Sequence, residues 1–118
     1  MNEIARIRER FLKDTSSVRL GNLAANLSRI VSFSQDSKNS KVVESLLEES
    51  KNFIEWMATD YELQVQSELI ELQIKLALWH LQWHSILADS QKLSKVRNEI
   101  EKLSKRLINL SGLLGQKE

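Results

Sequence analysis

The chain of 118 residues contains no cysteine and no proline, and it has only three glycines. Without cysteine there is no disulfide, no thiolate metal site and no cysteine nucleophile. Because proline and glycine are the main helix breakers, their scarcity favours long helices. The chain also lacks an apolar run approaching the roughly 20 residues that cross a bilayer, so we expect a cytoplasmic protein with no membrane segment.

Composition and length indicate one ordinary globular unit. Hydrophobic residues make up 42% of the chain and charged residues 28%, which is close to the average for folded domains. A chain of 118 residues is long enough to bury one hydrophobic core but too short for two independent ones. We therefore expect a single domain over residues 1–118.

Apolar residues recur at helical spacing in the second half of the chain. One stripe, in steps of three and four, comprises Leu93, Val96, Ile100, Leu103, Leu107, Leu110 and Leu114. An earlier stripe comprises Leu69, Leu72, Leu76, Trp79, Trp83 and Ile86. This spacing is typical of amphipathic helices, and a turn near Ala88–Ser90, with Asp89 or Ser90 as the cap, would join the two as an antiparallel hairpin.

Shorter stripes precede these two, separated by polar segments. They comprise Ile4, Ile7 and Phe11, then Leu20, Leu23, Leu27, Ile30 and Val31, and finally Val43, Leu47, Phe53, Ile54 and Met57. The segment "DTSS" supplies capping residues for the second stripe, and "SQDSKNS" reads as a loop. The pattern predicts an all-α antiparallel bundle of four main helices, with room for a short extra helix at the N-terminus.

The sequence leaves open whether residues 41–88 form one long helix or two. The segment "TDYE" at residues 59–62 fits a capping box, whereas the apolar spacing through it fits an unbroken helix. We favour a kink or short break at this point. The alternation in "LIELQIKLAL" also fits a strand, but its residues are good helix formers and no second strand is available to pair with it.

The tryptophan-containing helix is apolar on two sides. Opposite the main stripe lie Ile70, Ile74, Ala77, Leu78 and Leu81. Since a helix that is apolar all round is normally buried, this helix should lie at the centre of the bundle or be covered on its second side by another subunit. We therefore expect a homo-oligomer or a helical protein partner.

Two histidines, His80 and His84, stand four residues apart in "WHLQWH". On one helix they would face the same way and could hold a metal ion together. Zinc needs three or four ligands, however, and the pattern of glutamate three residues before histidine, found in di-metal bundles, is absent. We name the pair as the candidate metal site and favour a structural role for it, with no cofactor and no catalytic residue assigned.

Charge is distributed unevenly along the chain. Residues 1–35 carry +3, residues 36–72 carry −6 and residues 73–118 carry +4, for a net charge of +1. Nucleic-acid binding would use Arg6, Arg8, Arg10, Lys13 and Arg19, or Lys95, Lys102, Lys105 and Arg106. The near-neutral total and the absence of a base-reading motif count against it, and the blocks of opposite sign most simply compensate one another.

Three segments, "RLGNLAANLSRIVSFSQ", "VVESLLEESKNFIEWMA" and "ELIELQIKLALWHLQWHSIL", carry a resemblance to known proteins. Over residues 19–115 the chain resembles a group of small, uncharacterised, all-helical proteins associated with cyanobacteria. The resemblance implies a soluble helical bundle and transfers no ligand or catalytic residue.

The sequence as a whole favours a non-enzymatic module for protein interaction or structure, which self-associates. No phosphate-binding loop, serine elbow or metalloprotease motif is present, and Gly21, Ala24 and Ala25 read as a packing notch for a neighbouring helix. Two alternatives stay open. One is a small-molecule or metal-binding bundle that uses His80 and His84, and the other is a nucleic-acid-binding accessory protein.

Overall fold

The computed structural model describes residues 2–116, in which every regular element is helical. The α-helices are α1 (Glu3–Lys13), α2 (Ser16–Phe33), α3 (Ser40–Met57), α4 (Leu63–Leu81), α5 (Trp83–Leu87) and α6 (Ser90–Gly115), with short 3₁₀ helices η1 (Ser37–Asn39) and η2 (Ala58–Asp60). The all-α prediction is confirmed, although the described chain has six α-helices instead of four or five. No helix within residues 2–116 is long and apolar enough to cross a membrane.

Polar side chains at the helix starts explain several of these bounds. The Asn2 side chain accepts a hydrogen bond from the Ala5 amide, and Thr15, in "DTSS", accepts one from the Val18 amide. Asp89 accepts hydrogen bonds from the first-turn amides of α6, as the sequence suggests. Each side chain satisfies backbone amides that have no partner inside the helix, so the helix begins there.

Residues 41–88 form neither one helix nor two. The expected break separates α3 from α4, but the predicted capping box does not form, because Glu62 is the N-cap of α4 and makes no side-chain cap hydrogen bond. A second break, at Gln82, separates α4 from α5, since its backbone angles of φ −100° and ψ 10° depart from helical values. The predicted apolar stripe from Leu69 to Ile86 is therefore divided between α4 and α5.

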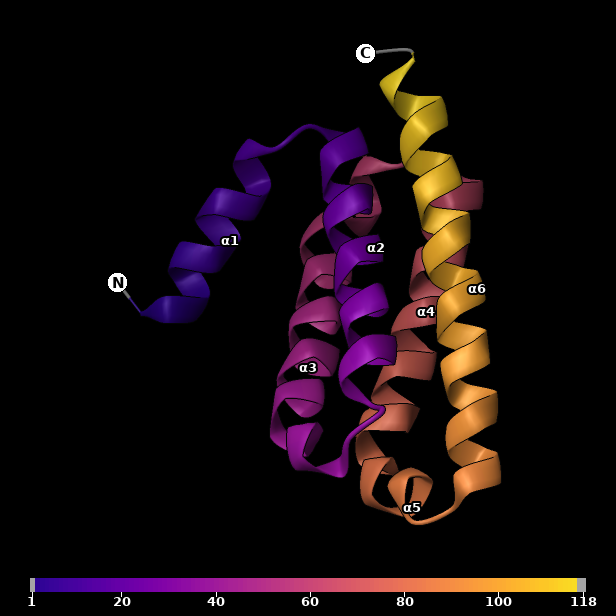
Figure 1. Cartoon of the computed structure of the whole chain (residues 1–118). Coiled ribbons are helices and arrows are strands. Elements are labelled where there is room, and N and C mark those ends of the chain that lie inside the picture. Colours follow the sequence, from indigo (N-terminus) through magenta and orange to yellow (C-terminus); the bar gives the residue numbers. More distant parts are fainter. Residues whose placement is uncertain (1, 117–118) are drawn as a thin grey trace.

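The four long helices α2, α3, α4 and α6 lie side by side, and α5 crosses one end of the bundle (Figure 1). The closest packing of α6 is against α2, and not against α4 as the predicted hairpin implies. Helix α1 leaves the bundle at an angle and is held to α3 by aromatic packing. The rings of Phe11 and Phe53 stack with centroids 4.2 Å apart, and Trp56 packs against both.

Small residues allow α2 and α6 to approach closely. A Cβ added at Gly21 would lie 3.5 Å from Oγ of Ser111, which places Gly21 at the contact as predicted. The Ser104 hydroxyl donates to the Ala24 carbonyl over 2.9 Å, so a polar side chain is buried with its hydrogen bond satisfied. Near the end of α6, Ser17 and Ser111 each donate a hydrogen bond to the carbonyl of the other over 2.7 Å.

The predicted main stripe of the tryptophan segment belongs to the hydrophobic core. All its members are buried, namely Leu69, Leu72, Leu76, Trp79, Trp83 and Ile86. From α6, Ile100, Leu107 and Leu110 are buried as predicted, and the other stripe residues are partly buried against the same core. Burial of one stripe from each long helix is what an amphipathic pattern requires.

Candidate functional site: the outer face of α4

The side of α4 that faces away from the core carries a line of apolar residues. This outer face comprises the predicted second apolar side, Ile70, Ile74, Ala77, Leu78 and Leu81, together with Leu63 and the small polar Ser67. Its large side chains are 44–83% exposed. The sequence places this second apolar side either at the centre of the bundle or under another subunit. In the single chain the helix is not central, so its outer face meets solvent.

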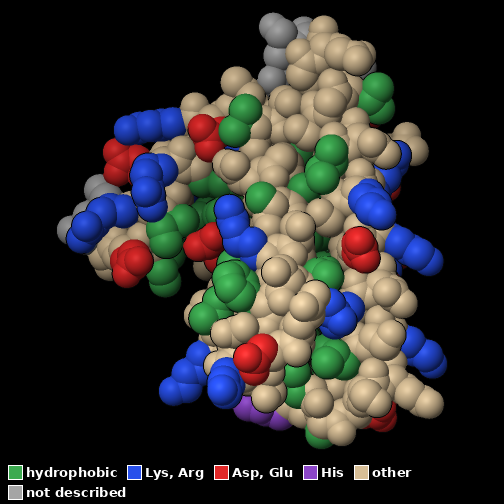
Figure 2. Space-filling model, in the orientation of Figure 1, with side chains coloured by type: hydrophobic (Ala, Val, Ile, Leu, Met, Phe, Trp, Pro, Cys, Tyr) green, Lys and Arg blue, Asp and Glu red, His purple; other side chains and the backbone are tan. Residues whose placement is uncertain are grey.

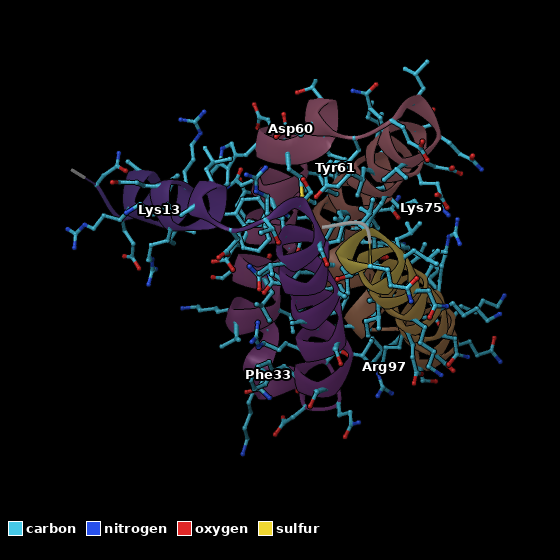
Figure 3. All side chains as sticks on the ribbon, turned by 90° about the horizontal axis from the view of Figure 1, so that it is seen from above. Lys13, Phe33, Asp60, Tyr61, Lys75 and Arg97 are labelled. Carbon is cyan, nitrogen blue, oxygen red and sulfur yellow. The ribbon has the colours of Figure 1, made fainter. Side chains whose placement is uncertain are left out.

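No other helix of the described chain covers this face. Viewed down the bundle, α1 projects on one side, with Lys13 at its end, whereas α4, with Lys75, lies on the other (Figure 3). Helix α1 is fixed to α3 through Phe11 and Phe53, away from α4. The outer face of α4 is therefore open along its whole length.

The borders of the outer face are polar, and Glu71 adds a negative charge to one of them. Gln64, Gln66 and Gln73 are neutral, and Gln73 donates a hydrogen bond to the Lys51 carbonyl over 3.3 Å. On the side towards α6, Lys75 Nζ lies 2.7 Å from Glu99 Oε1. An apolar centre with a polar border is the usual anatomy of a protein interface.

The Lys75–Glu99 pair should make stability depend on alkaline pH. The hydrogen bond to Glu99 is the main cause that raises the pKa of Lys75 above its usual 10.5, helped by the charges of Glu99 and Glu71 and opposed by desolvation. A raised pKa gives a contribution that is complete below pH 10.5 and is lost as pH rises through the folded-state value. Because the pair is partly exposed, we expect less than about 1 kcal/mol.

Urea titrations of wild type and Lys75→Gln at about pH 8 and about pH 12 measure this effect, because lysine is charged at the first pH and largely neutral at the second. The difference in unfolding free energy between the two proteins should shrink at the higher pH. A constant or growing difference would show that the Lys75 charge does not stabilise the fold.

His80 lies beside the outer face, in the last turn of α4, and contacts α3. Lys51 Nζ donates a hydrogen bond to its Nδ1 over 3.0 Å and also lies 3.0 Å from Glu48 Oε2. Glu48 Oε2 is in turn 3.4 Å from the same ring nitrogen. An ammonium group therefore occupies the place where a metal ion would meet Nδ1.

His84 belongs to α5, beyond the break at Gln82, and its ring is largely exposed. Its Nε2 lies 3.9 Å from Oε1 of Glu44, one helical turn from Glu48 on α3. His80 and His84 therefore lie on different helices, and each faces a different carboxylate of α3. Within residues 2–116, no group of three or more histidine, aspartate or glutamate side chains is placed to hold a metal ion.

We expect zinc to leave the melting temperature nearly unchanged, because two histidines with separate partners offer an ion few placed ligands. A native state that binds zinc at a hundredfold excess over its dissociation constant would gain about 2.7 kcal/mol, which is several degrees. Thermal melts of wild type and the His80→Gln, His84→Gln double variant, with and without zinc, measure this. A zinc-dependent rise in wild type alone would establish the metal site.

Several of the basic residues considered for nucleic-acid binding form ion pairs with acidic side chains, namely Lys13, Arg19, Lys105 and Arg106. In Figure 2, Lys and Arg side chains spread over α1 and along α6, with Asp and Glu side chains among them. Arg19 pairs with Asp60 over 3.0 Å, and Arg106 makes two hydrogen bonds to Glu68. These pairs reduce the positive charge available to phosphates.

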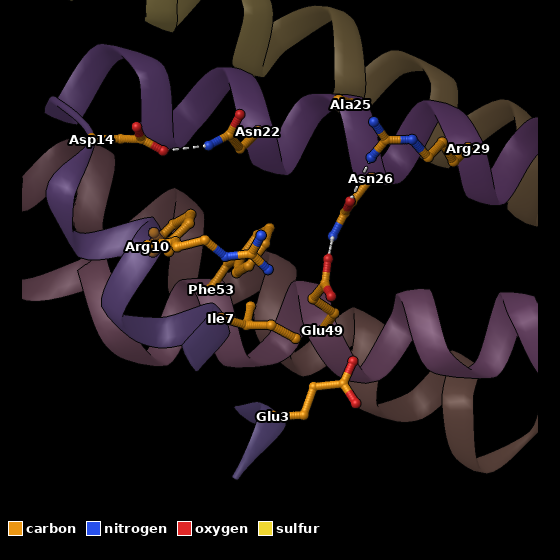
Figure 4. Close-up of a pocket in the computed structure, with 11 residues that line it drawn as sticks. Glu3, Ile7, Arg10, Asp14, Asn22, Ala25, Asn26, Arg29, Glu49 and Phe53 are labelled. Atoms are coloured by element: carbon orange, nitrogen blue, oxygen red, sulfur yellow. Dashed lines mark hydrogen bonds between the residues drawn. The ribbon is translucent and has the colours of Figure 1, made fainter. Parts of the chain in front are cut away.

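A hollow of about 590 Å³ lies between α1 and the helices α2 and α3 (Figure 4). Ala25, which the sequence groups with Gly21 and Ala24 as a packing notch, lines this hollow. The buried Asn26 side chain donates to Glu49 over 3.0 Å and accepts from Arg29 over 2.9 Å. Because these groups satisfy one another, the hollow offers a weaker case for a ligand than the outer face of α4 offers for a partner.

Comparison with known proteins adds no functional residue to this description. No family model, no curated protein and no solved structure matches the chain. The geometry of the described residues therefore carries the functional proposal.

Proposed function

We propose that this protein is a non-enzymatic, cytoplasmic interaction module that binds another helix through the outer face of α4. The observation that carries the proposal is the line of exposed leucines and isoleucines along one side of a 19-residue helix. Burying such side chains against a partner is favourable by about 25 cal/mol per Å² of apolar surface. Single exposed apolar residues need no explanation, but a continuous patch marks an interaction site.

The bundle provides a rigid support for this surface. We assign α2, α3, α4 and α6 as the four main helices, with α1 and α5 as additions at its edge. The inner side of α4 is anchored by Leu69, Leu72 and Leu76, which are buried. A partner therefore meets a preformed helix and does not have to order it, which lowers the entropic cost of binding.

The two alternatives have less support from the contacts. Metal binding by His80 and His84 would require Lys51 to leave the His80 ring nitrogen or the ion to use the other nitrogen. Nucleic-acid binding would draw on basic residues of which Arg19 and Arg106 already pair with acids. Helix binding requires no such rearrangement.

Site-specific photo-cross-linking tests the proposal. A benzophenone amino acid replaces either Leu78, on the outer face of α4, or Val18, on α2. The two residues have similar exposure, 50% for Leu78 and 46% for Val18. In an extract of the source cells, the variant with the photo-reactive residue at position 78 should give a discrete protein adduct. Introducing Ile74→Glu into that same variant should abolish the adduct. Equal adducts from position 18, or an adduct that Ile74→Glu leaves unchanged, would contradict it.

A further inference from the structure

The outer face of α4 contains a seam with a symmetrical pattern. Its members, in steps of four, three, four, three and four, are Leu63, Ser67, Ile70, Ile74, Ala77 and Leu81. In both directions the seam reads large, small, large, large, small, large. Alternating steps of three and four are the spacing at which two helices pack along a common seam.

We propose that the partner is a second copy of this chain, and that the two α4 helices pair antiparallel about a two-fold axis at the level of Leu72. This inference rests on the proposed function of the outer face. Leu63 then faces the partner's Leu81, and Ile70 faces the partner's Ile74. Ser67 faces the partner's Ala77, so the small residues meet and the backbones approach closely.

The symmetry of the pattern distinguishes antiparallel pairing from parallel pairing. Any helix matches itself when two copies run parallel, whereas antiparallel pairing requires the seam to be symmetrical about its centre. The seam begins at Leu63 and ends at Leu81, which are also the first and last residues of α4. Two copies therefore overlap over the full helix, about 27 Å, with helix dipoles opposed.

Exposure follows the same symmetry. Leu63 and Leu81 are 80% and 83% exposed, and Ile70 and Ile74 are 44% and 58% exposed. Side chains that would meet across the axis therefore offer similar apolar area, and both members of each layer become buried together. An isologous interface of this kind closes on itself and gives a dimer, not a filament.

The borders of the seam predict which polar residues meet. In an antiparallel pair each border lies against the same border of the partner, so Glu71 approaches the partner's Glu71 and Gln73 approaches the partner's Gln73. Lys75, which attracts Glu71, partly offsets the like charges. Glu71→Gln should therefore strengthen association by about twofold, as removal of a like-charge pair does.

Cysteine cross-linking tests the register, because the natural chain has no cysteine. The variants Ser67→Cys and Ala77→Cys change exposed residues and should keep the fold. Mixed and oxidised, they should form the 67–77 heterodisulfide. Each variant alone should form little, because its two cysteines would lie about 15 Å apart along the helices, beyond the roughly 7 Å that a disulfide spans.

Val18→Cys gives the background from random collision, since it is exposed on α2. Homodisulfides from Ser67→Cys alone and from Ala77→Cys alone would establish parallel pairing and overturn this inference, while the proposed function of the outer face would stand. Cross-linking no stronger than that of Val18→Cys would overturn pairing between copies. The adduct at position 78 then shows separately whether the face binds a different protein.

Discussion

Replacing Trp83 with alanine is expected to lower the free energy of unfolding by about 3 to 5 kcal/mol, the usual cost of removing a buried aromatic side chain. Its side chain is 1% exposed, on α5, where that helix packs against α6. The indole Nε1 has no hydrogen-bond partner within the described residues, so the loss should come from packing. We expect a loss in the same range for Trp79→Ala, since Trp79 is also buried in the main stripe.

Urea titration of the dilute protein measures the change, and Leu81→Ala provides the matched control. Leu81 lies two residues before Trp83 but is 83% exposed. Its replacement should change the unfolding free energy by no more than about 0.5 kcal/mol, as is usual at the surface. Similar losses for the two variants would show that α5 does not pack as described.

Replacing Ile74 with glutamate is expected to weaken self-association by about 100-fold or more, because the interface would have to bury a carboxylate against apolar side chains. The two-fold axis places the substitution in the interface twice. The monomer should keep its stability, since Ile74 is 58% exposed in the single chain. Sedimentation velocity over a concentration series measures the association constant.

Val18→Glu is the control for added charge. Val18 is exposed on the first turn of α2, where an acidic residue suits the helix dipole. This variant should associate as wild type does. Equal weakening by the two substitutions would indicate a general effect of net charge, and no weakening by Ile74→Glu would place the interface elsewhere.

The apolar stripes predict the helices and their buried sides because helical spacing depends only on local geometry. The position of α6 is harder to predict, since the residues that draw it to α2 are small or polar. Ser104 and Ser111 lie on the side of α6 that faces α2, and their hydroxyls donate to carbonyls of that helix. A search for apolar residues passes over them, although Gly21 and Ala24 do indicate a close helix contact.

The break at Gln82 also has no clear local signal. No glycine or proline lies next to Gln82 in the sequence. The backbone changes direction at this residue, and α5 crosses the end of the bundle. This tertiary effect separates His80 from His84, which the sequence alone places on one helix. An acidic pair at the same spacing, Glu44 and Glu48, could have indicated their partners, once α3 and α4 are taken to be antiparallel.

The outer face of α4 was predictable as an apolar surface because its residues follow helical spacing. Its exposure was not predictable, since the same pattern fits a helix at the centre of a bundle. The fold decides between these possibilities by packing α4 against α3 and leaving Ile70, Ile74 and Leu78 in solvent.

Sedimentation equilibrium of the wild-type protein is the most direct measurement of the central claim, that two copies pair through α4. With rising concentration, the mass should increase from the 13.7 kDa of one chain towards twice that value and then stop. With Ile74→Glu it should stay near 13.7 kDa over the same range. A wild-type mass of 13.7 kDa at every concentration, or a dimer that Ile74→Glu leaves intact, would contradict the claim.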